Sequence, residues 1–242
     1  NLDHLENMFD LEKTELHVLN YWLSVGDDDP GTHYLDAINE FIENGVDNKN
    51  ILRLWMVNLI CRFGGWDASY VKIAEKTMNV YIREFGEQHP DTLVSKVLFA
   101  GALANMGEFE RSEKLERTVL EIRENTLGPE HPDTLVSISN LANTLNLMGD
   151  YEGADELSRT SLEIKERTLG SEHPETLISM SNHAMLLRDM GDYKGAENLC
   201  RTALEVRKRT LGQEHIDTLN SMNHYASILS KLGDYEAAEE LI

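Results

Sequence analysis

One five-residue sequence returns along the chain at a constant interval. It reads HPDTL at residues 89–93 and 131–135, HPETL at 173–177, and HIDTL at 215–219. The interval is 42 residues each time. Two further columns keep the same period, one of glycine (Gly107, Gly149, Gly191, Gly233) and one of alanine (Ala100, Ala142, Ala184, Ala226). A fixed period in this range predicts a solenoid, in which each unit packs mainly against its neighbours.

Each unit has the pattern of two helices. In the unit that begins at Asp133, apolar residues recur every three or four positions as far as Met148, which is typical of one buried helical face. Gly149 can take the left-handed conformation that ends this helix, and the side chain of Asp150 can cap the next one. The second helix is predicted to end at Gly170. The unit is therefore predicted to be a helical hairpin.

The repeat divides the chain into three parts. Residues 91–242 hold three complete units and a truncated fourth. Residues 48–90 keep a weaker pattern and are interpreted as a divergent hairpin, with helices expected at 51–63 and 70–85. Residues 1–47 are acidic, and they are either a helical N-terminal cap or the tail of a preceding module. We expect both ends to be cuts through a longer parent chain, since the last unit stops early.

The charge of the chain limits the partners it can bind. The formal net charge is −21, and the first 50 residues hold twelve acidic side chains against two basic ones. A phosphate backbone needs clustered Lys and Arg, so we expect no nucleic-acid partner. A basic protein or peptide partner is compatible with this charge, and so is a purely solubilising role. The longest apolar run, 51–63, is interrupted by polar residues, so no membrane association is expected.

The sequence lacks the motifs that indicate an enzyme. It contains no G-x-x-x-x-G-K-[ST] phosphate loop, no H-E-x-x-H and no C-x-x-C. We therefore expect no catalytic residue and no cofactor. The two cysteines, Cys61 and Cys200, lie on apolar helix faces and are interpreted as buried thiols. Buried thiols without a disulfide favour a reducing compartment, so the expected location is cytoplasmic.

The histidines are interpreted as structural rather than as metal ligands. His131, His173 and His215 recur once per unit in the expected turns, so they are too far apart to share one metal ion. His183 and His224 lie on successive first helices and could approach each other. A third ligand is lacking, however, and we expect no metal site.

The repeat resembles the tetratricopeptide repeat. The family pattern Leu-Gly-x-x-Tyr followed by Ala-x-x-x-Phe here reads Leu141-Ala142-x-x-Leu145 and Ala154-x-x-x-Ser158. The period of 42 exceeds the usual period of about 34, and the extra residues fit as a longer second helix. This long form, with the link LGPEHP at 127–132, resembles the kinesin light chain subclass. It is also similar to arrays found beside nucleotide-binding switch domains in fungal and bacterial proteins.

The resemblance is strong over 87–242, weak over 48–86 and hardly detectable over 1–47. It implies an all-α fold, a right-handed superhelical solenoid of antiparallel helix hairpins. It also implies that the first helix of each hairpin lines a concave groove. On that basis the 42-residue columns assign the groove side chains, which are Asn140, Asn143, Asn146, Asn182, Met185, Arg188, Asn223, His224 and Ser227.

These columns favour a function in protein binding. An amide is both donor and acceptor, so Asn140 and Asn182 can bond the backbone of an extended peptide, although they would also be suited to facing water. We therefore expect a protein–protein interaction scaffold that binds an extended peptide or a helix. The alternative is the sensor or regulatory arm of a larger nucleotide-dependent switch receptor, packed against another domain of its parent chain.

Overall fold

The computed structural model describes residues 67–241, and within them every regular element is a helix. The chain forms two compact units, Asn1–Gly86 and Glu87–Ile242. The described part of the first unit is α5 (Asp67–Phe85), where a helix is predicted over 70–85. The helix expected at 51–63 and the acidic segment 1–47 lie outside the described residues. The predicted all-α hairpin repeat is confirmed.

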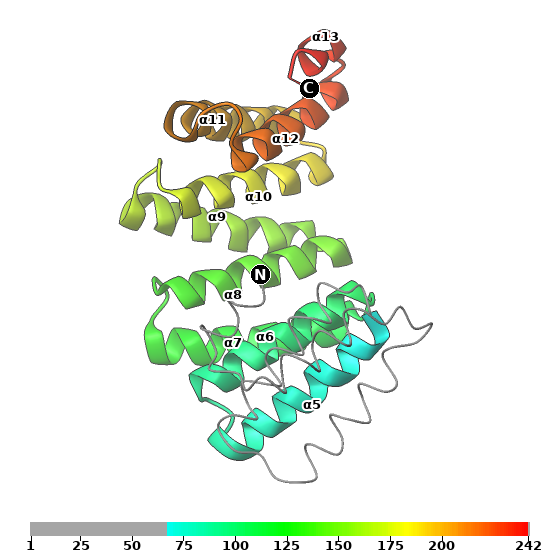
Figure 1. Ribbon diagram of the computed structural model, residues 1–242, viewed down its shortest axis with the longest axis vertical. Coiled ribbons are helices and arrows are strands. Elements are labelled where there is room, and N and C mark those ends of the chain that lie inside the picture. The colour runs from blue at the N-terminus through cyan, green and yellow to red at the C-terminus, as the bar shows by residue number, and fades with distance from the viewer. Residues whose placement is uncertain (1–66, 242) are drawn as a thin grey trace, which may run out of the picture. The chain divides into compact units, whose positions relative to one another are not determined.

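Four hairpins make up the second unit (Figure 1). Their first helices are α6 (Pro90–Asn105), α8 (Pro132–Met148), α10 (Pro174–Met190) and α12 (Ile216–Leu232). Their second helices are α7 (Phe109–Leu127), α9 (Tyr151–Leu169), α11 (Tyr193–Leu211) and α13 (Tyr235–Glu239). From α8 to α12, each first helix packs against the second helix of its own hairpin and against that of the hairpin before. Among the described residues, no helix combines the length and apolarity needed to cross a bilayer.

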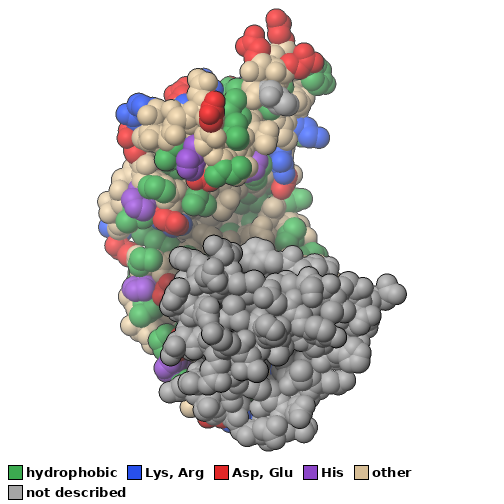
Figure 2. Space-filling model, viewed as in Figure 1, with side chains coloured by type: hydrophobic (Ala, Val, Ile, Leu, Met, Phe, Trp, Pro, Cys, Tyr) green, Lys and Arg blue, Asp and Glu red, His purple; other side chains and the backbone are tan. Residues whose placement is uncertain are grey.

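Each first helix begins at a histidine cap. The Nδ1 atom of His131 accepts a hydrogen bond from the backbone N–H of Asp133 at 3.1 Å. The other three hairpins repeat this contact at His89, His173 and His215. On the face seen in Figure 2, histidine side chains recur along one side of the unit, as a contact made once per hairpin requires. From the sequence we expect these residues only in turns, and the structure adds that they satisfy a free backbone donor of the helix.

The junction within each hairpin follows the predicted chemistry. Gly149 ends α8 in the left-handed conformation, with φ 82°. The carboxylate of Asp150 then accepts a hydrogen bond from the backbone N–H of Gly153 at 3.1 Å, which caps α9. A side chain at Gly149 would be strained at this φ, so glycine allows the sharp reversal between the two helices.

The apolar core repeats between neighbouring hairpins. Leu135, Ile138, Leu141 and Leu145 of α8 are each no more than 4% exposed. They pack together with Ala154 of the next helix and with residues of the hairpins on either side. Complete burial of one such side chain contributes about 1.5–3 kcal/mol. The stability of each hairpin therefore depends largely on its neighbours.

Each of three successive hairpin interfaces contains a buried cation. Each cation belongs to a second helix and donates to a serine hydroxyl on the next first helix. The pairs are Arg123 with Ser137 at 2.8 Å, Lys165 with Ser179 at 2.8 Å, and Arg207 with Ser221. Burial lowers the pKa of all three cations, because water no longer solvates the charge. The serine hydroxyls partly replace that water.

We predict that His131→Ala lowers the free energy of unfolding by about 0.5–2 kcal/mol, because the N–H of Asp133 loses its acceptor. The loss is measured by urea denaturation. His131→Asn is the matched control, since an asparagine cap supplies an equivalent oxygen and should retain most of the stability. Equal destabilisation by Ala and Asn would show that the imidazole contributes something other than the cap.

Candidate binding groove

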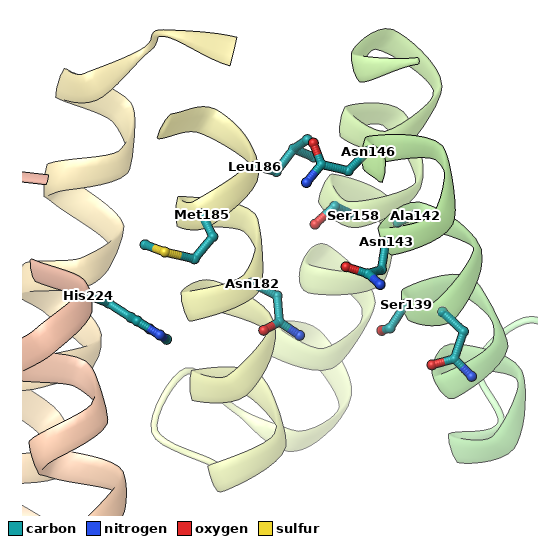
Figure 3. A pocket seen from close by; sticks show the side chains of 10 residues that line it. Ser139, Ala142, Asn143, Asn146, Ser158, Asn182, Met185, Leu186 and His224 are labelled. Atoms are coloured by element: carbon teal, nitrogen blue, oxygen red, sulfur yellow. The ribbon is translucent and has the colours of Figure 1, made fainter. Parts of the chain in front are cut away.

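A hollow of about 430 Å³ opens on the first-helix side of the second unit. Its walls come from α8, α10 and α12, and α9 contributes Ser158 (Figure 3). The lining residues are Ser139, Asn140, Ala142, Asn143, Asn146, Ser158, Asn182, Met185, Leu186 and His224. Residues 42 positions apart lie at equivalent places on the first helices of successive hairpins. Asn140 of α8, Asn182 of α10 and His224 of α12 therefore all line this hollow.

Six of the nine predicted groove residues line the hollow, namely Asn140, Asn143, Asn146, Asn182, Met185 and His224. Asn143 and Asn182 are exposed and Asn140 is half-buried. In the described part of the chain, no hydrogen bond engages the side-chain amides of these three residues, so they are free to bond a ligand. Whether they do so stays a prediction.

Asn146 is held differently from the other amides. Its nitrogen donates to Oδ2 of Asp189 at 3.2 Å, which ties α8 to α10. Asp189 also accepts from Arg188 at 2.7 Å. Arg188 is therefore paired with a neighbouring carboxylate, and it is not among the residues that line the hollow. The sequence predicts a groove cation at this position, but Asp189 largely neutralises the charge of the Arg188 guanidinium.

Two further predicted residues lie outside the lining of the hollow. Asn223 is exposed and Ser227 is half-buried, both on α12. They follow the same columns as Ser139 and Asn143, two hairpins further along the unit. Their contribution to the groove stays a prediction.

His224, at the α12 end of the hollow, is half-buried beside two cations. Burial lowers the pKa of His224, and the nearby cations Arg188 and Arg207 lower it further. The ring is therefore neutral at neutral pH, and its Nδ1 atom is buried without a hydrogen-bond partner in the described residues. An anion or a neutral acceptor is better tolerated at this end than a second cation.

His183 does not join His224 in a metal site. Its Nε2 atom lies 2.8 Å from Oδ1 of Asp155, in a partly buried pair between α10 and α9. Within residues 67–241 no three potential ligands come close enough to hold a metal ion. Cys200 is a buried free thiol whose pKa is raised by burial to about 11. Cys61 lies outside the described residues, and the cytoplasmic location stays a prediction.

An aliphatic stripe borders the amides and is not among the residues singled out from the sequence. It consists of Val94, Val136 and Ile178, which are 41%, 45% and 43% exposed. Val136 lies one helical turn before Asn140 and therefore shares its face of α8. The signal was present in the sequence, because the three residues form a 42-residue column of their own. The groove face therefore combines apolar contact area with free amides.

Glu116 of α7 is also not among the residues identified from the sequence. Its side chain is only 5% exposed, and its Oε2 atom has no hydrogen-bond partner among the described residues. Burial raises the pKa of this carboxyl to about 7. A hydrogen bond from Thr144 lowers the pKa, and the negative charge of Glu113 raises it. The available signal was its column, because the next two hairpins have the small residues Ser158 and Cys200 at this position.

We predict that Glu116→Gln stabilises the protein at alkaline pH. The folded-state pKa lies above the ordinary value of 4.5, so the stability of the wild type falls as pH rises from about 4.5 to 7 and then levels off. A neutral amide of the same shape avoids this loss. Urea denaturation at pH 8 should show a gain of roughly 2–3 kcal/mol over the wild type.

At pH 5 most of that gain should disappear, since Glu116 is then protonated in the folded state. Glu121→Gln removes an exposed carboxylate from the same helix, and we expect its effect to differ little between the two pH values. A gain for Glu116→Gln of equal size at pH 5 and pH 8 would contradict the raised pKa.

Comparison with known proteins places the repeat in a family. The tetratricopeptide repeat profile matches residues 95–167, 136–198 and 175–242, which together span more than half of the chain. No curated protein matches the chain. The structure of a variant of a kinesin light chain-like protein from Podosopora anserina, built of nearly identical TPR-like repeats, is similar, with a TM-score of 0.69 and 26% identity over 79% of this chain and 90% of the other.

Two more distant structures share the fold. BtubC (BKLC) from P. vanneervenii has a TM-score of 0.66 at 16% identity, over 88% of this chain and 85% of its own. The apo form of RapI has a TM-score of 0.59 at 15% identity, over 87% and 86%. The resemblance to kinesin light chain-type repeats is confirmed by the Podosopora structure and by the family profile. The chain belongs to the tetratricopeptide repeat family.

Proposed function

We propose that this chain is a protein-interaction scaffold that holds an extended peptide across its first helices. The observation that carries the proposal is the hollow, where Asn140, Asn143 and Asn182 present free amides from consecutive hairpins. An extended peptide has a backbone N–H and C=O at every residue, and an amide side chain can pair with either. The hairpins would therefore repeat one kind of contact along the peptide.

The aliphatic stripe supports the same ligand. A peptide backbone bonded to the amides would have side chains close to Val94, Val136 and Ile178. Burial of this apolar area would contribute to the binding free energy. Hydrogen bonds contribute less, because they replace hydrogen bonds that both partners already make to water. A binding surface with apolar area beside a few well-placed polar groups is the usual composition of a protein recognition site.

The charges near the groove disfavour one class of peptide. Capture of a C-terminal carboxylate needs several free cations, and here Arg188 is already paired with Asp189. Arg207 lies in the hairpin interface, where it donates to Ser181 at 3.0 Å. The proposed ligand is therefore an internal peptide segment, on a separate protein or on another part of the parent chain.

We predict that replacing Asn140 and Asn182 together by Ala weakens peptide binding about tenfold to thirtyfold, since each lost amide contact is worth about 1 kcal/mol. The ligands are peptides selected on the wild-type chain from a random dodecapeptide library, and their affinity is measured by fluorescence anisotropy. Asn182 is exposed and Asn140 is only half-buried, so thermal unfolding should change little.

The matched control replaces two amides on second helices, Asn125 and Asn198, by Ala. Both are exposed and lie away from the lining of the hollow. They should leave the affinity unchanged. If both double variants bind every selected peptide as the wild type does, the peptide-binding surface is not this groove.

A further inference from the structure

Glu116 belongs to the groove floor by the register of the repeat. It lies 42 residues before Ser158, so the two occupy the same position in successive hairpins. Ser158 lines the hollow between α8 and α10, beside Leu186. The residue 42 positions before Leu186 is Thr144, which is the hydrogen-bonding neighbour of Glu116. Both equivalences place the carboxyl between α6 and α8, one hairpin before the hollow.

The first helix above this carboxyl carries unusually small side chains. Gly101 and Ala104 stand where the next hairpin has Asn143 and Asn146. A Cβ atom added at Gly101 would meet no other atom within 4 Å in the described part of the chain. The groove face of α6 is therefore open at Gly101, where the equivalent position of α8 carries the side chain of Asn143.

No cation of the packed helices neutralises Glu116. The titratable side chains of α6 are Asp91 and Lys96, and that of α8 is Asp133. Lys96 is engaged by Glu87. None of these groups contributes to the pKa of Glu116, so none of them acts as its counter-ion.

The charged neighbour on α7 itself is also an acid. Glu113 lies one turn before Glu116, and its charge raises the pKa of Glu116. Glu113 has its own partner, Arg117, at 2.8 Å. The carboxyl of Glu116 is thus a buried acceptor that has no positive partner among the described residues.

The opposite end of the groove is less suited to a cation. Burial lowers the pKa of His224 and the cations Arg188 and Arg207 lower it further, although Asp189 pairs with Arg188, so a ligand cation is less favoured there than beside Glu116. A ligand cation is best accommodated at the Glu116 end, where it meets an acceptor and no competing positive charge. The two ends therefore discriminate between orientations of a charged peptide.

We propose that Glu116 is the subsite for one lysine or arginine side chain of the bound peptide, an inference that rests on the proposed peptide-binding function. The ammonium or guanidinium group passes over Gly101 and forms an ion pair with the buried carboxylate. Glu116 is already desolvated in the free protein, so only the ligand cation loses water, and a charge-assisted hydrogen bond to the carboxylate offsets that cost.

Binding is coupled to loss of a proton. With the groove empty, burial holds the pKa of Glu116 at about 7, so part of the population carries a neutral carboxyl at neutral pH. The ligand cation favours the ionised form, and the proton leaves to solvent. Affinity should rise as pH increases from 6 to 8, by up to about tenfold, as the ionised fraction grows.

The test uses the full chain and random dodecapeptides selected in parallel on the wild type and on Glu116→Gln. We expect lysine or arginine at one position of the wild-type peptides and no such enrichment on the variant. For one selected peptide, replacing its lysine by norleucine or its arginine by citrulline should weaken binding to the wild type about tenfold or more. The same replacement should cost little on Glu116→Gln.

Calorimetry in two buffers of different ionisation enthalpy should record release of about half a proton on binding near pH 7, and none with Glu116→Gln. Glu121→Gln is the control for charge, and circular dichroism confirms that each variant folds. Peptides that depend on Asn140 and Asn182 but show no basic position, or no sensitivity to Glu116→Gln, would overturn the subsite and leave the proposed function standing. Peptides insensitive to all of these changes would overturn both.

Discussion

The constraint on which this structure depends is the burial of each first helix on two sides. The face of α8 that carries Leu135, Ile138, Leu141 and Leu145 packs together with residues of its own hairpin and of its neighbours. A single hairpin cannot cover this face alone, so the fold requires a stack of equivalent units in one register. The 42-residue period of the sequence is the direct trace of that requirement, since every buried position has to recur at the same place.

The remaining face of each first helix is not buried by neighbouring hairpins, and its residues differ from one hairpin to the next. Asn140, Asn182 and His224 share one column, and Gly101, Asn143 and Met185 share another. None of these side chains is fully buried, so their identity can change at less cost to the fold than that of the core positions, although Met185 packs partly against the core of the next interface. The proposed peptide groove and its two electrically different ends both use this freedom.

The same division explains how much the sequence could predict. The hairpins, the Gly149 turn and the Asp150 cap follow from periodicity and local backbone chemistry, and all three appear in the structure. Six predicted groove residues meet in the hollow because a helical face and a fixed period determine which residues meet. The histidine caps were missed because their role depends on a rotamer that places Nδ1 over a backbone N–H. Glu116 was missed because the protonation state of its carboxyl depends on how deeply α6 and α8 bury it.

The pairing of buried cations with serine has a consequence for how such a protein can change. Arg123, Lys165 and Arg207 each meet a neutral hydroxyl at the equivalent position of the following helix. These three cations would therefore keep a hydroxyl partner if the hairpins followed one another in a different order. Duplication or deletion of one 42-residue segment would preserve this cation–serine pairing while realigning the exposed face. Removal of residues 133–174, for example, would place Leu186 beside Glu116 in place of Thr144. The stack is thus a modular array whose exposed surface can change one hairpin at a time.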